Sequence, residues 1–212
     1  MIQIIITDDH PLVREGLKNV VTQDTLDIKV VGEASSGGEL MKLLNKKVPE
    51  LLILDITMPD KSGLDVLKEV KQLYPKLSVL ILSMHPEDRF AIRAIKAGAA
   101  GYLTKSSISD ELVAAIRTIV QKNRRYISMD LAEQLALQLD NNFKKYPHEA
   151  LSDREYQILC LIASGKKVRE IADELSLSIQ TIHTYRSRLK EKLNLDSNVE
   201  FTRYAMQNDL ID

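Results

Sequence analysis

The sequence predicts an α/β protein in which a doubly wound (βα)5 domain precedes a second, all-α domain. Three observations support this prediction. Between residues 1 and about 120, short apolar runs alternate five times with helical patterns; the third run, LLIL, is unbroken; and residues 151–212 carry helical patterns but no strand pattern. Unbroken apolar strands are typical of a parallel sheet covered on both faces, and the alternation with helices implies right-handed crossovers.

Five apolar runs give the predicted strands, at residues 2–7, 28–34, 51–55, 77–83 and 100–104. The segments between them repeat apolar residues at the spacing of an amphipathic helix, as at Leu64, Leu67 and Val70. In a sheet of this kind, ligand chemistry lies at the carboxyl ends of the strands. These ends are therefore the first place to look for functional residues.

The second half of the chain changes character after residue 120. A predicted short helix at 129–139 runs into the polar stretch DNNFKKYPHE, whose Asn and Pro residues discourage regular structure. Four helical patterns follow, at residues 152–164, 168–175, 178–193 and 197–208. Ser152 and Glu155 form a capping-box pattern, and Ser178 suits an N-cap. The predicted division is a first domain at 1–120, a linker at 121–149 and a second domain at 150–212.

Composition sets outer limits on the function. The chain has 212 residues, of which 44% are hydrophobic and 28% charged, and a net charge of −1 argues neither for nor against a nucleic-acid partner. No apolar run approaches the ~20 residues of a membrane span. No secretory signal pattern opens the chain, and the single Cys160, within the apolar run ILCLI, fits a core position. We expect a soluble, cytoplasmic protein without a membrane partner.

Acidic residues gather at the predicted sheet edge. Asp8 and Asp9 end the first strand and Asp55 ends the third, so a strand order of 2-1-3 brings the three carboxylates together. Clustered carboxylates repel one another unless a cation neutralises them. Oxygen ligands of this type suit Mg2+. The sequence therefore predicts a magnesium site at this edge.

The same edge offers groups for chemistry on phosphorus. The fourth strand ends in Ser83 and the fifth is followed by Lys105. A lysine and a cation can offset charge on phosphoryl oxygens while Asp55 attacks as the nucleophile, which gives an aspartyl phosphate. Taken singly, Ser83 could be a helix cap and Lys105 a solvated loop charge. Their joint placement at the strand ends favours the chemical interpretation.

The motifs TDDH, LLILDITMPDKSG, ILSMH and AGAAGYLTK resemble the receiver domain of bacterial two-component response regulators. This resemblance covers about residues 1–120. It implies that Asp55 accepts a phosphoryl group from a sensor histidine kinase, and that Mg2+ is held by Asp8, Asp9, Asp55 and the carbonyl of Thr57.

The resemblance also implies roles for residues around the phosphoryl group. Ser83 and Lys105 would bind it, Tyr102 would reorient when Ser83 moves, and Thr57 and His85 would tune the phosphate lifetime. For Tyr102 and His85, ordinary surface packing is an open alternative. The chain departs from most receivers at Ser106, because a proline in a cis peptide usually follows the lysine, and a non-proline cis bond costs ~2.5–4 kcal/mol.

The helix predicted from Ser178 has two distinct faces. Ile179, Ile182, Leu189 and Leu193 form an apolar stripe. The opposite face is rich in hydrogen-bonding groups, as a helix in the DNA major groove requires: Gln180, His183, Thr184, Ser187, Arg188 and Glu191. Periodicity alone fits an ordinary solvated face equally well. The short turn LSLS before this helix favours a helix-turn-helix.

Residues 150–210 resemble the helix-turn-helix domain of the NarL/FixJ (LuxR-type) regulators, through GKKVREIA, LSIQTIHTY and KLNL. The resemblance makes the helix from Ser178 the recognition helix on double-stranded DNA. The implied DNA contacts are Lys166, Arg169, Thr181, His183, Thr184, Arg186, Ser187 and Arg188. Many members have Ser-Asn where this chain has Lys167 and Val168, which removes a usual N-cap. The Lys-Val pair, TYRSRLKEKLNL and AEQLALQL resemble most the GacA/UvrY subgroup, which implies a global activator acting through small regulatory RNA genes.

The combined interpretation is a two-component response regulator and transcriptional regulator. Phosphorylation would move Ser83 and Tyr102 and would then promote either a homodimer or the release of the DNA-binding domain from the receiver. A two-fold homodimer would match palindromic half-sites. Phe201 and Tyr204 are candidate dimer contacts, with core packing as the alternative. We expect no enzymatic activity beyond the chain's own phosphorylation and dephosphorylation. A phosphatase of the haloacid-dehalogenase type is a rival, but Thr57 stands where that class has a second Asp. A DNA-binding protein with a vestigial receiver is another.

Overall fold

The computed structural model describes the chain except for residues 59–60, 85–86, 129–130, 134–145, 209 and 212. It contains two compact units, Met1–Leu135 and Ala136–Asp212. Among the described residues, no helix has both the length and the apolar character that a membrane span needs.

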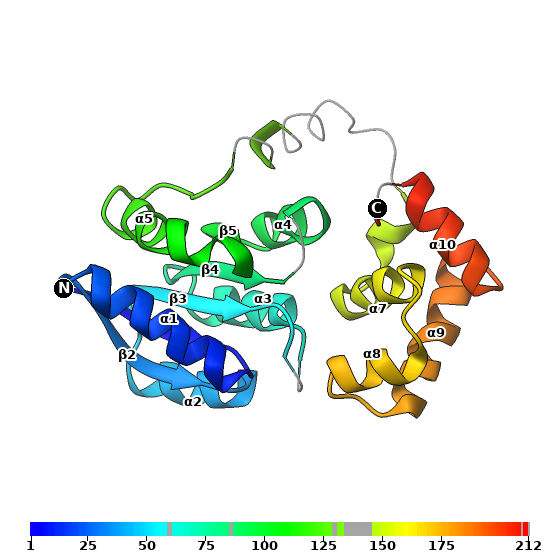
Figure 1. Cartoon of the computed structure of the whole chain (residues 1–212), viewed down its shortest axis with the longest axis horizontal. Coiled ribbons are helices and arrows are strands. Elements are labelled where there is room, and N and C mark those ends of the chain that lie inside the picture. Colours follow the sequence, from blue (N-terminus) through cyan, green and yellow to red (C-terminus); the bar gives the residue numbers. More distant parts are fainter. Residues whose placement is uncertain (59–60, 85–86, 129–130, 134–145, 209, 212) are drawn as a thin grey trace. The chain divides into compact units, whose positions relative to one another are not determined.

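The first unit is a parallel sheet with the strand order β2-β1-β3-β4-β5 (Figure 1). Its strands are β1 (Ile2–Thr7), β2 (Ile28–Ala34), β3 (Leu51–Asp55), β4 (Ser78–Ser83) and β5 (Gly101–Thr104). Its helices are α1 (Pro11–Asp24), α2 (Gly37–Lys46), α3 (Gly63–Leu73), α4 (Glu87–Lys96) and α5 (Ile108–Val120). The predicted doubly wound fold is confirmed, and the fourth and fifth strands each begin one residue later than expected.

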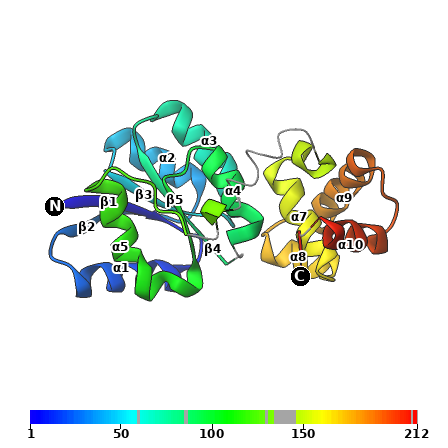
Figure 2. The same ribbon diagram turned by 90° about the horizontal axis from the view of Figure 1, so that it is seen from above.

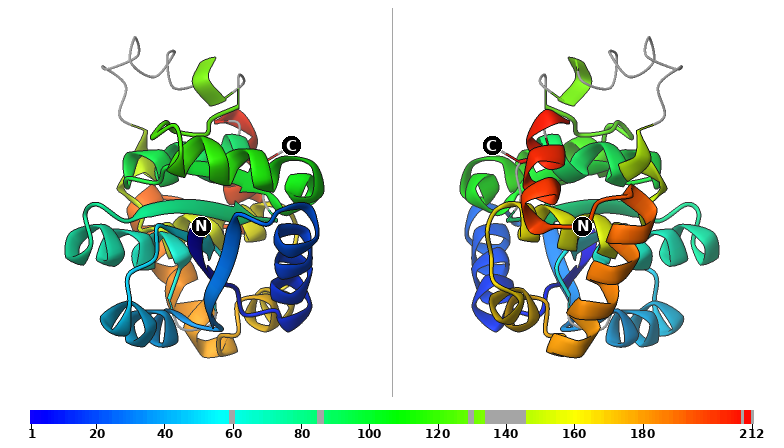
Figure 3. Two further views of the ribbon diagram at one scale, coloured as in Figure 1. Left: turned by 90° about the vertical axis from the view of Figure 1, so that its left-hand side faces the viewer. Right: turned by 90° about the vertical axis from the view of Figure 1, so that its right-hand side faces the viewer.

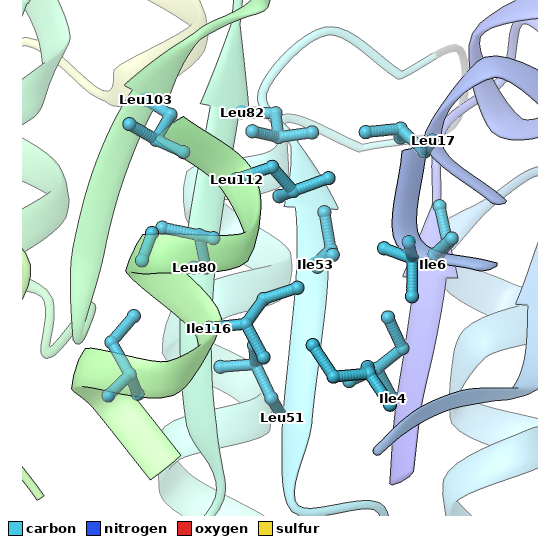
Figure 4. Close-up of a cluster of buried hydrophobic side chains, with 14 of the residues drawn as sticks. Ile4, Ile6, Leu17, Leu51, Ile53, Leu80, Leu82, Leu103, Leu112 and Ile116 are labelled. Atoms are coloured by element: carbon cyan, nitrogen blue, oxygen red, sulfur yellow. The ribbon is translucent and has the colours of Figure 1, made fainter. Parts of the chain in front are cut away.

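Helices cover both faces of this sheet. Figure 2 shows α1 and α5 on one side and α2 and α3 on the other, and Figure 3 separates α1 from α2 in the same way. Every residue of β3 is buried, which explains the unbroken apolar run. Alternate residues of each strand face the α1/α5 side, where the buried cluster in Figure 4 includes Ile4, Ile6, Leu17, Leu51, Ile53, Leu80, Leu82, Leu103, Leu112 and Ile116.

The chain after α5 returns to the sheet at β5. Tyr126 forms an isolated parallel bridge with Gly101, and its amide donates to the carbonyl of Ala100 at 2.8 Å. The Tyr126 hydroxyl donates to Glu111 Oε2 at 2.7 Å. A Cβ at Gly101 would lie 2.8 Å from the Tyr126 carbonyl oxygen, so the pairing of Tyr126 with β5 requires glycine at position 101. The first part of the predicted linker therefore packs on the first unit; most of the predicted helix at 129–139 lies outside the described residues.

The second unit is all-helical, as predicted. A short 3-10 turn, η2 (Pro147–Ala150), precedes four helices: α7 (Asp153–Ala163), α8 (Val168–Glu174), α9 (Ile179–Leu193) and α10 (Asn198–Gln207). The capping box of Ser152 and Glu155 is present, and Ser178 Oγ accepts from the Thr181 amide at 3.0 Å. Between α8 and α9, Ser176 takes a left-handed conformation with φ 51°, which allows the sharp turn of a helix-turn-helix.

Candidate functional sites

Four side chains from the ends of β1 and β3 form an acidic cluster. Asp8, Asp9, His10 and Asp55 each place one possible ligand atom within 4.8 Å of all the others. Asp8 and Asp55 are each 1% exposed. β1 and β3 are hydrogen-bonded neighbours, which explains why Asp8 and Asp55, 47 positions apart in the sequence, meet at one edge.

Lys105 lies between two of these carboxylates. Its Nζ is 2.6 Å from Asp8 Oδ2 and 2.9 Å from Asp55 Oδ2, and its side chain is 6% exposed. The residue begins the 3-10 turn η1 (Lys105–Ser107), and the peptide bond between Lys105 and Ser106 is trans. The Ser106 hydroxyl instead hydrogen-bonds to Thr104 Oγ1 at 2.9 Å. Lys105 thus reaches the cluster without the usual proline.

Lys105 does not balance the charge of the carboxylates around it. Burial raises the pKa of Asp55 to about 6, which Lys105 opposes and Asp8 reinforces. Burial lowers the pKa of Lys105, but Asp55 and Asp8 outweigh it, so the net shift is upward. One ammonium group therefore serves two buried carboxylates, and Asp9 adds a third negative group at the same place.

The donor set fits a hard divalent cation. Asp55 Oδ1 is buried and accepts no hydrogen bond within the described part of the chain. A buried carboxylate oxygen without a donor is costly unless a cation binds it. Three carboxylates match the oxygen ligands that Mg2+ prefers, and the half-buried Thr57 lies two residues after Asp55.

The remaining predicted receiver residues lie on β4 and β5. Ser83 is the last residue of β4, is fully buried and pairs in register with Thr104. Tyr102 is also fully buried on β5, so the alternative of surface packing is wrong for this residue. His85 lies outside the described residues. The roles of Ser83 and Tyr102 stay predictions.

Sequence reasoning missed two residues that shape the acidic cluster. A Cβ at Gly63 would collide with the carbonyl oxygen of Asp55, and the Gly63 amide donates to the Ile56 carbonyl at 2.8 Å. Arg14 Nη1 donates to the carbonyl oxygen of Asp8 at 2.7 Å. Neither contact follows from strand-end position, which was the signal used to find the other residues.

On α9, most of the predicted division into two faces is confirmed. Ile182, Leu189 and Leu193 are buried. The polar face is exposed throughout, at Gln180, His183, Thr184, Ser187, Arg188 and Glu191. Ile179 was wrongly placed in the apolar stripe, because it is 48% exposed. It is the first residue of α9, and a helical side chain points toward the N-terminus, so it projects beyond the packed turns.

The predicted DNA contacts with hydroxyl side chains all form hydrogen bonds within the protein. Thr184 and Ser187 donate their hydroxyls to the backbone carbonyls of Gln180 and His183, both at 3.1 Å. Their lone pairs remain available to accept hydrogen bonds. The Thr181 hydroxyl is hydrogen-bonded to Ser178 Oγ at 2.7 Å.

The predicted cationic DNA contacts differ in their exposure and in the partners that they already have within the protein. Arg169 is exposed, and Arg188 lies 5.7 Å from the centroid of the Tyr185 ring. Arg186 is half-buried, and its Nε has no hydrogen-bond partner among the described residues. Lys166 forms an ion pair with Glu174. Arg169 and Arg188 are therefore the most accessible cations of the set.

Local interactions fix the start of α8 and the end of α9 in the helix-turn-helix. The start of α8, which lacks a usual N-cap, is Val168; the Lys167 amide donates instead to Glu170 Oε2 at 2.8 Å. Lys192 on α9 forms an ion pair with Glu155 Oε2 at 2.7 Å, a contact that the sequence did not indicate.

On α10, Phe201 is fully buried, so the core-packing alternative holds for it. Tyr204 is half-buried and its hydroxyl accepts from the His148 amide at 3.2 Å.

Comparison with known proteins identifies both units. Residues 4–117 match the response regulator receiver domain, and residues 149–205 match the bacterial regulatory proteins of the luxR family. The chain is 37% identical over 211 residues to the response regulator UvrY of Escherichia coli, covering 99% of this chain and 96% of the relative. It is 38% identical over 213 residues to the response regulator GacA of Pseudomonas aeruginosa, covering 100% and 99%.

Solved structures of other response regulators have a similar fold. RcsB from Salmonella enterica serovar Typhimurium, bound to promoter rprA in the presence of the phosphomimetic BeF3-, matches with a TM-score of 0.63 and 27% identity, over 97% of this chain and 99% of that one. A LuxR-family two-component response regulator from Aurantimonas sp. matches with a TM-score of 0.59 and 36% identity, over 65% and 97%.

Proposed function

Because the chain belongs to the response regulators that join a receiver domain to a LuxR-type DNA-binding domain, within the GacA/UvrY subgroup, we propose that phosphorylation of Asp55 by a sensor histidine kinase controls its binding to DNA. The observation that carries this assignment is the shared Lys105 ammonium, 2.6 Å from Asp8 and 2.9 Å from Asp55. It places a buried cation beside the carboxylate that would attack phosphorus.

The chain's own groups account for the transfer. An oxygen of Asp55 attacks the phosphorus atom of the kinase phosphohistidine, a P–O bond forms and the P–N bond breaks. Lys105 and the hydroxyl of Ser83 then bind the transferred phosphoryl oxygens. Asp8, Asp9, Asp55 and the carbonyl of Thr57 would hold Mg2+, which supplies charge neutralisation on those oxygens when bound.

The response to phosphorylation would pass through β4 and β5. Ser83 moves toward the phosphoryl group, and the buried Tyr102 two strand positions before Thr104 reorients. Such a change biases an existing two-state element, here the surface formed by α4, β5 and α5. A homodimer follows, as suits a factor that reads palindromic half-sites. Dimers on DNA are described for the related RcsB.

In the DNA-binding domain, α9 would enter the major groove. His183, Thr184 and Ser187 read base edges there, while Lys166, Arg169, Arg186 and Arg188 contact phosphates and Thr181 lies at the helix start. The exposed polar face of α9 supports this assignment. The subgroup suggests a global activator of small regulatory RNA genes.

We assign the chain no catalytic activity on other molecules and a cytoplasmic location, where its kinase and DNA partners meet. Thr57 offers no acid to protonate the leaving group of a small phosphoester, which argues against a phosphatase. The intact acidic cluster argues against a vestigial receiver.

Light scattering of the full chain with Mg2+, with and without beryllofluoride as a phosphoryl mimic, tests the proposal. The expected result is a doubling of mass in the wild type and none in Asp55→Asn. Incubation with acetyl phosphate, followed by mass spectrometry, should add one phosphoryl group to the wild type only. If Asp55→Asn is phosphorylated equally, the assignment of Asp55 is wrong; sustained turnover of acetyl phosphate would favour the phosphatase.

A further inference from the structure

We propose that Arg14 is a positioning residue: its guanidinium fixes the peptide between Asp8 and Asp9 and thereby aims the Asp9 carboxylate at the cation site. The inference rests on the proposed function, because it concerns the same Mg2+ site. It adds a residue that lies outside the acidic cluster and on a different element, the first turn of α1.

The contacts of Arg14 form a chain from the cluster to the end of β2. Nη1 donates to the Asp8 carbonyl oxygen at 2.7 Å. Nε lies 3.7 Å from Glu33 Oε2, and Lys18 Nζ is 2.8 Å from Glu33 Oε1. The Arg14 side chain is 17% exposed, so solvent screens its contacts less than those of a fully exposed arginine. Glu33 is thus hydrogen-bonded to Lys18 and lies within ion-pair distance of Arg14, so its charge favours the guanidinium orientation that reaches Asp8.

The Asp8 carbonyl needs such a donor because β1 ends at Thr7. The Asp8 amide still pairs with the Ala34 carbonyl at 3.2 Å, but no backbone amide of the described residues donates to the Asp8 carbonyl oxygen. The Asp8 side chain is fixed separately, since Oδ1 accepts from the His10 amide at 2.8 Å and Oδ2 contacts Lys105. The Asp9 carboxylate has its own contact, because Oδ1 lies 2.7 Å from His10 Nδ1. Arg14 adds a contact to the backbone, on the peptide plane that leads into Asp9.

Charge and hydrogen bonding act in opposite directions here. A guanidinium near a divalent cation repels it, so removal of the charge alone would strengthen Mg2+ binding. Glu33 offsets that repulsion by pairing with Arg14. Loss of the hydrogen bond frees the Asp8–Asp9 peptide and weakens binding, as is usual when an outer-shell partner of a ligand is removed. A weaker affinity in a variant that loses the charge therefore identifies the positioning effect.

The test is calorimetric titration of the full chain with Mg2+, without any phosphoryl donor. Arg14→Gln should bind Mg2+ about tenfold more weakly than the wild type. Arg14→Lys keeps the charge, but one ammonium group cannot serve both Asp8 and Glu33, so its affinity should also fall. The matched control is Arg117→Gln on α5, which removes an ion pair of 3.0 Å between Arg117 and Asp27, away from the site, and should bind Mg2+ like the wild type.

Thermal melting in EDTA accompanies each titration, and the proposal requires weaker Mg2+ binding without a matching loss of stability. If Arg14→Gln binds Mg2+ with the affinity of the wild type, the inference is wrong. If Arg14→Gln does not fold, Arg14→Lys takes its place, and wild-type Mg2+ affinity in that variant overturns the inference. If the wild type itself binds no Mg2+ and is not phosphorylated by acetyl phosphate, the result contradicts the proposed function, on which the role of Arg14 depends. Normal phosphorylation with unchanged Mg2+ affinity in both variants rejects the role of Arg14 alone.

Discussion

Lys105 and Arg188 are both cations that the sequence assigns to phosphate groups, but their surroundings differ. Lys105 is 6% exposed and lies between the carboxylates of Asp8 and Asp55. Arg188 is exposed and packs over the Tyr185 ring. In the receiver, each group depends on several others, so one substitution should disturb the whole site. On α9, the groups are separate, and substitutions should have small and nearly additive effects.

The largest expected effect comes from Gly63, because it tests how tightly the receiver site is built. A Cβ there would collide with the Asp55 carbonyl oxygen and lie 2.7 Å from the Ile56 Cα, both backbone atoms that cannot move without moving Asp55. We expect Gly63→Ala to lower the free energy of unfolding of the receiver by about 3 kcal/mol. Phosphorylation by acetyl phosphate should also be lost.

The matched control for Gly63 is Gly16 within α1, where an added Cβ would meet nothing within 4 Å. Gly16→Ala should stabilise the receiver by roughly 0.5–1 kcal/mol, since alanine is the better helix former. Urea denaturation measures both variants. Equal stability of the two variants would show that the backbone around Asp55 is less constrained than the structure indicates.

A second prediction concerns the buried charge of Asp55. Its pKa is raised from 3.8 to about 6 in the folded protein, so the unfolded chain gives up the proton at lower pH. Stability is therefore lost as the pH rises from about 4 to about 6, by roughly 2–3 kcal/mol in EDTA. Asp55→Asn should lack this loss, and Mg2+ should reverse it in the wild type.

Melting curves at several pH values, with and without Mg2+, measure this effect. The advantage of Asp55→Asn over the wild type should grow between about pH 4 and 6 and then stay constant. An advantage that is independent of pH would show that Asp55 titrates normally and that burial does not dominate its environment.

The smallest expected effects lie on α9 and α8. His183→Ala should reduce discrimination at one base position by about 1–3 kcal/mol. Arg169→Ala should weaken binding to all sequences alike and lower the slope of log affinity against log salt by about one. Fluorescence anisotropy with a duplex selected from random sequence, at several salt concentrations, separates the two effects.

Lys46→Ala, an exposed lysine on α2 of the receiver, is the control for the DNA measurements. It should leave both affinity and salt slope unchanged. If Arg169→Ala changed base preference, or His183→Ala changed only the salt slope, the assignment of base-reading and phosphate-contacting roles would be reversed.

Most of the fold could be predicted because strands and helices have simple periods. All five strands and the four helices of the second unit follow from apolar spacing and caps such as Ser152. The order of the first three strands comes from the doubly wound fold class, and it is the observed one. The error at Ile179 has a local cause, since periodicity assigns a face but does not show whether a neighbouring helix extends far enough to cover it.

The sequence by itself determined which residues stand at strand ends, and parallel pairing then brings Asp8, Asp55 and Lys105 to one edge. Only the tertiary structure decided that Tyr102 is buried, that Gly63 lies against the Asp55 backbone, and that Arg14 donates to the Asp8 carbonyl. The physical reason is that strand direction and side-chain alternation are properties of one segment. Close approaches between backbone atoms and side chains depend instead on how separate segments pack.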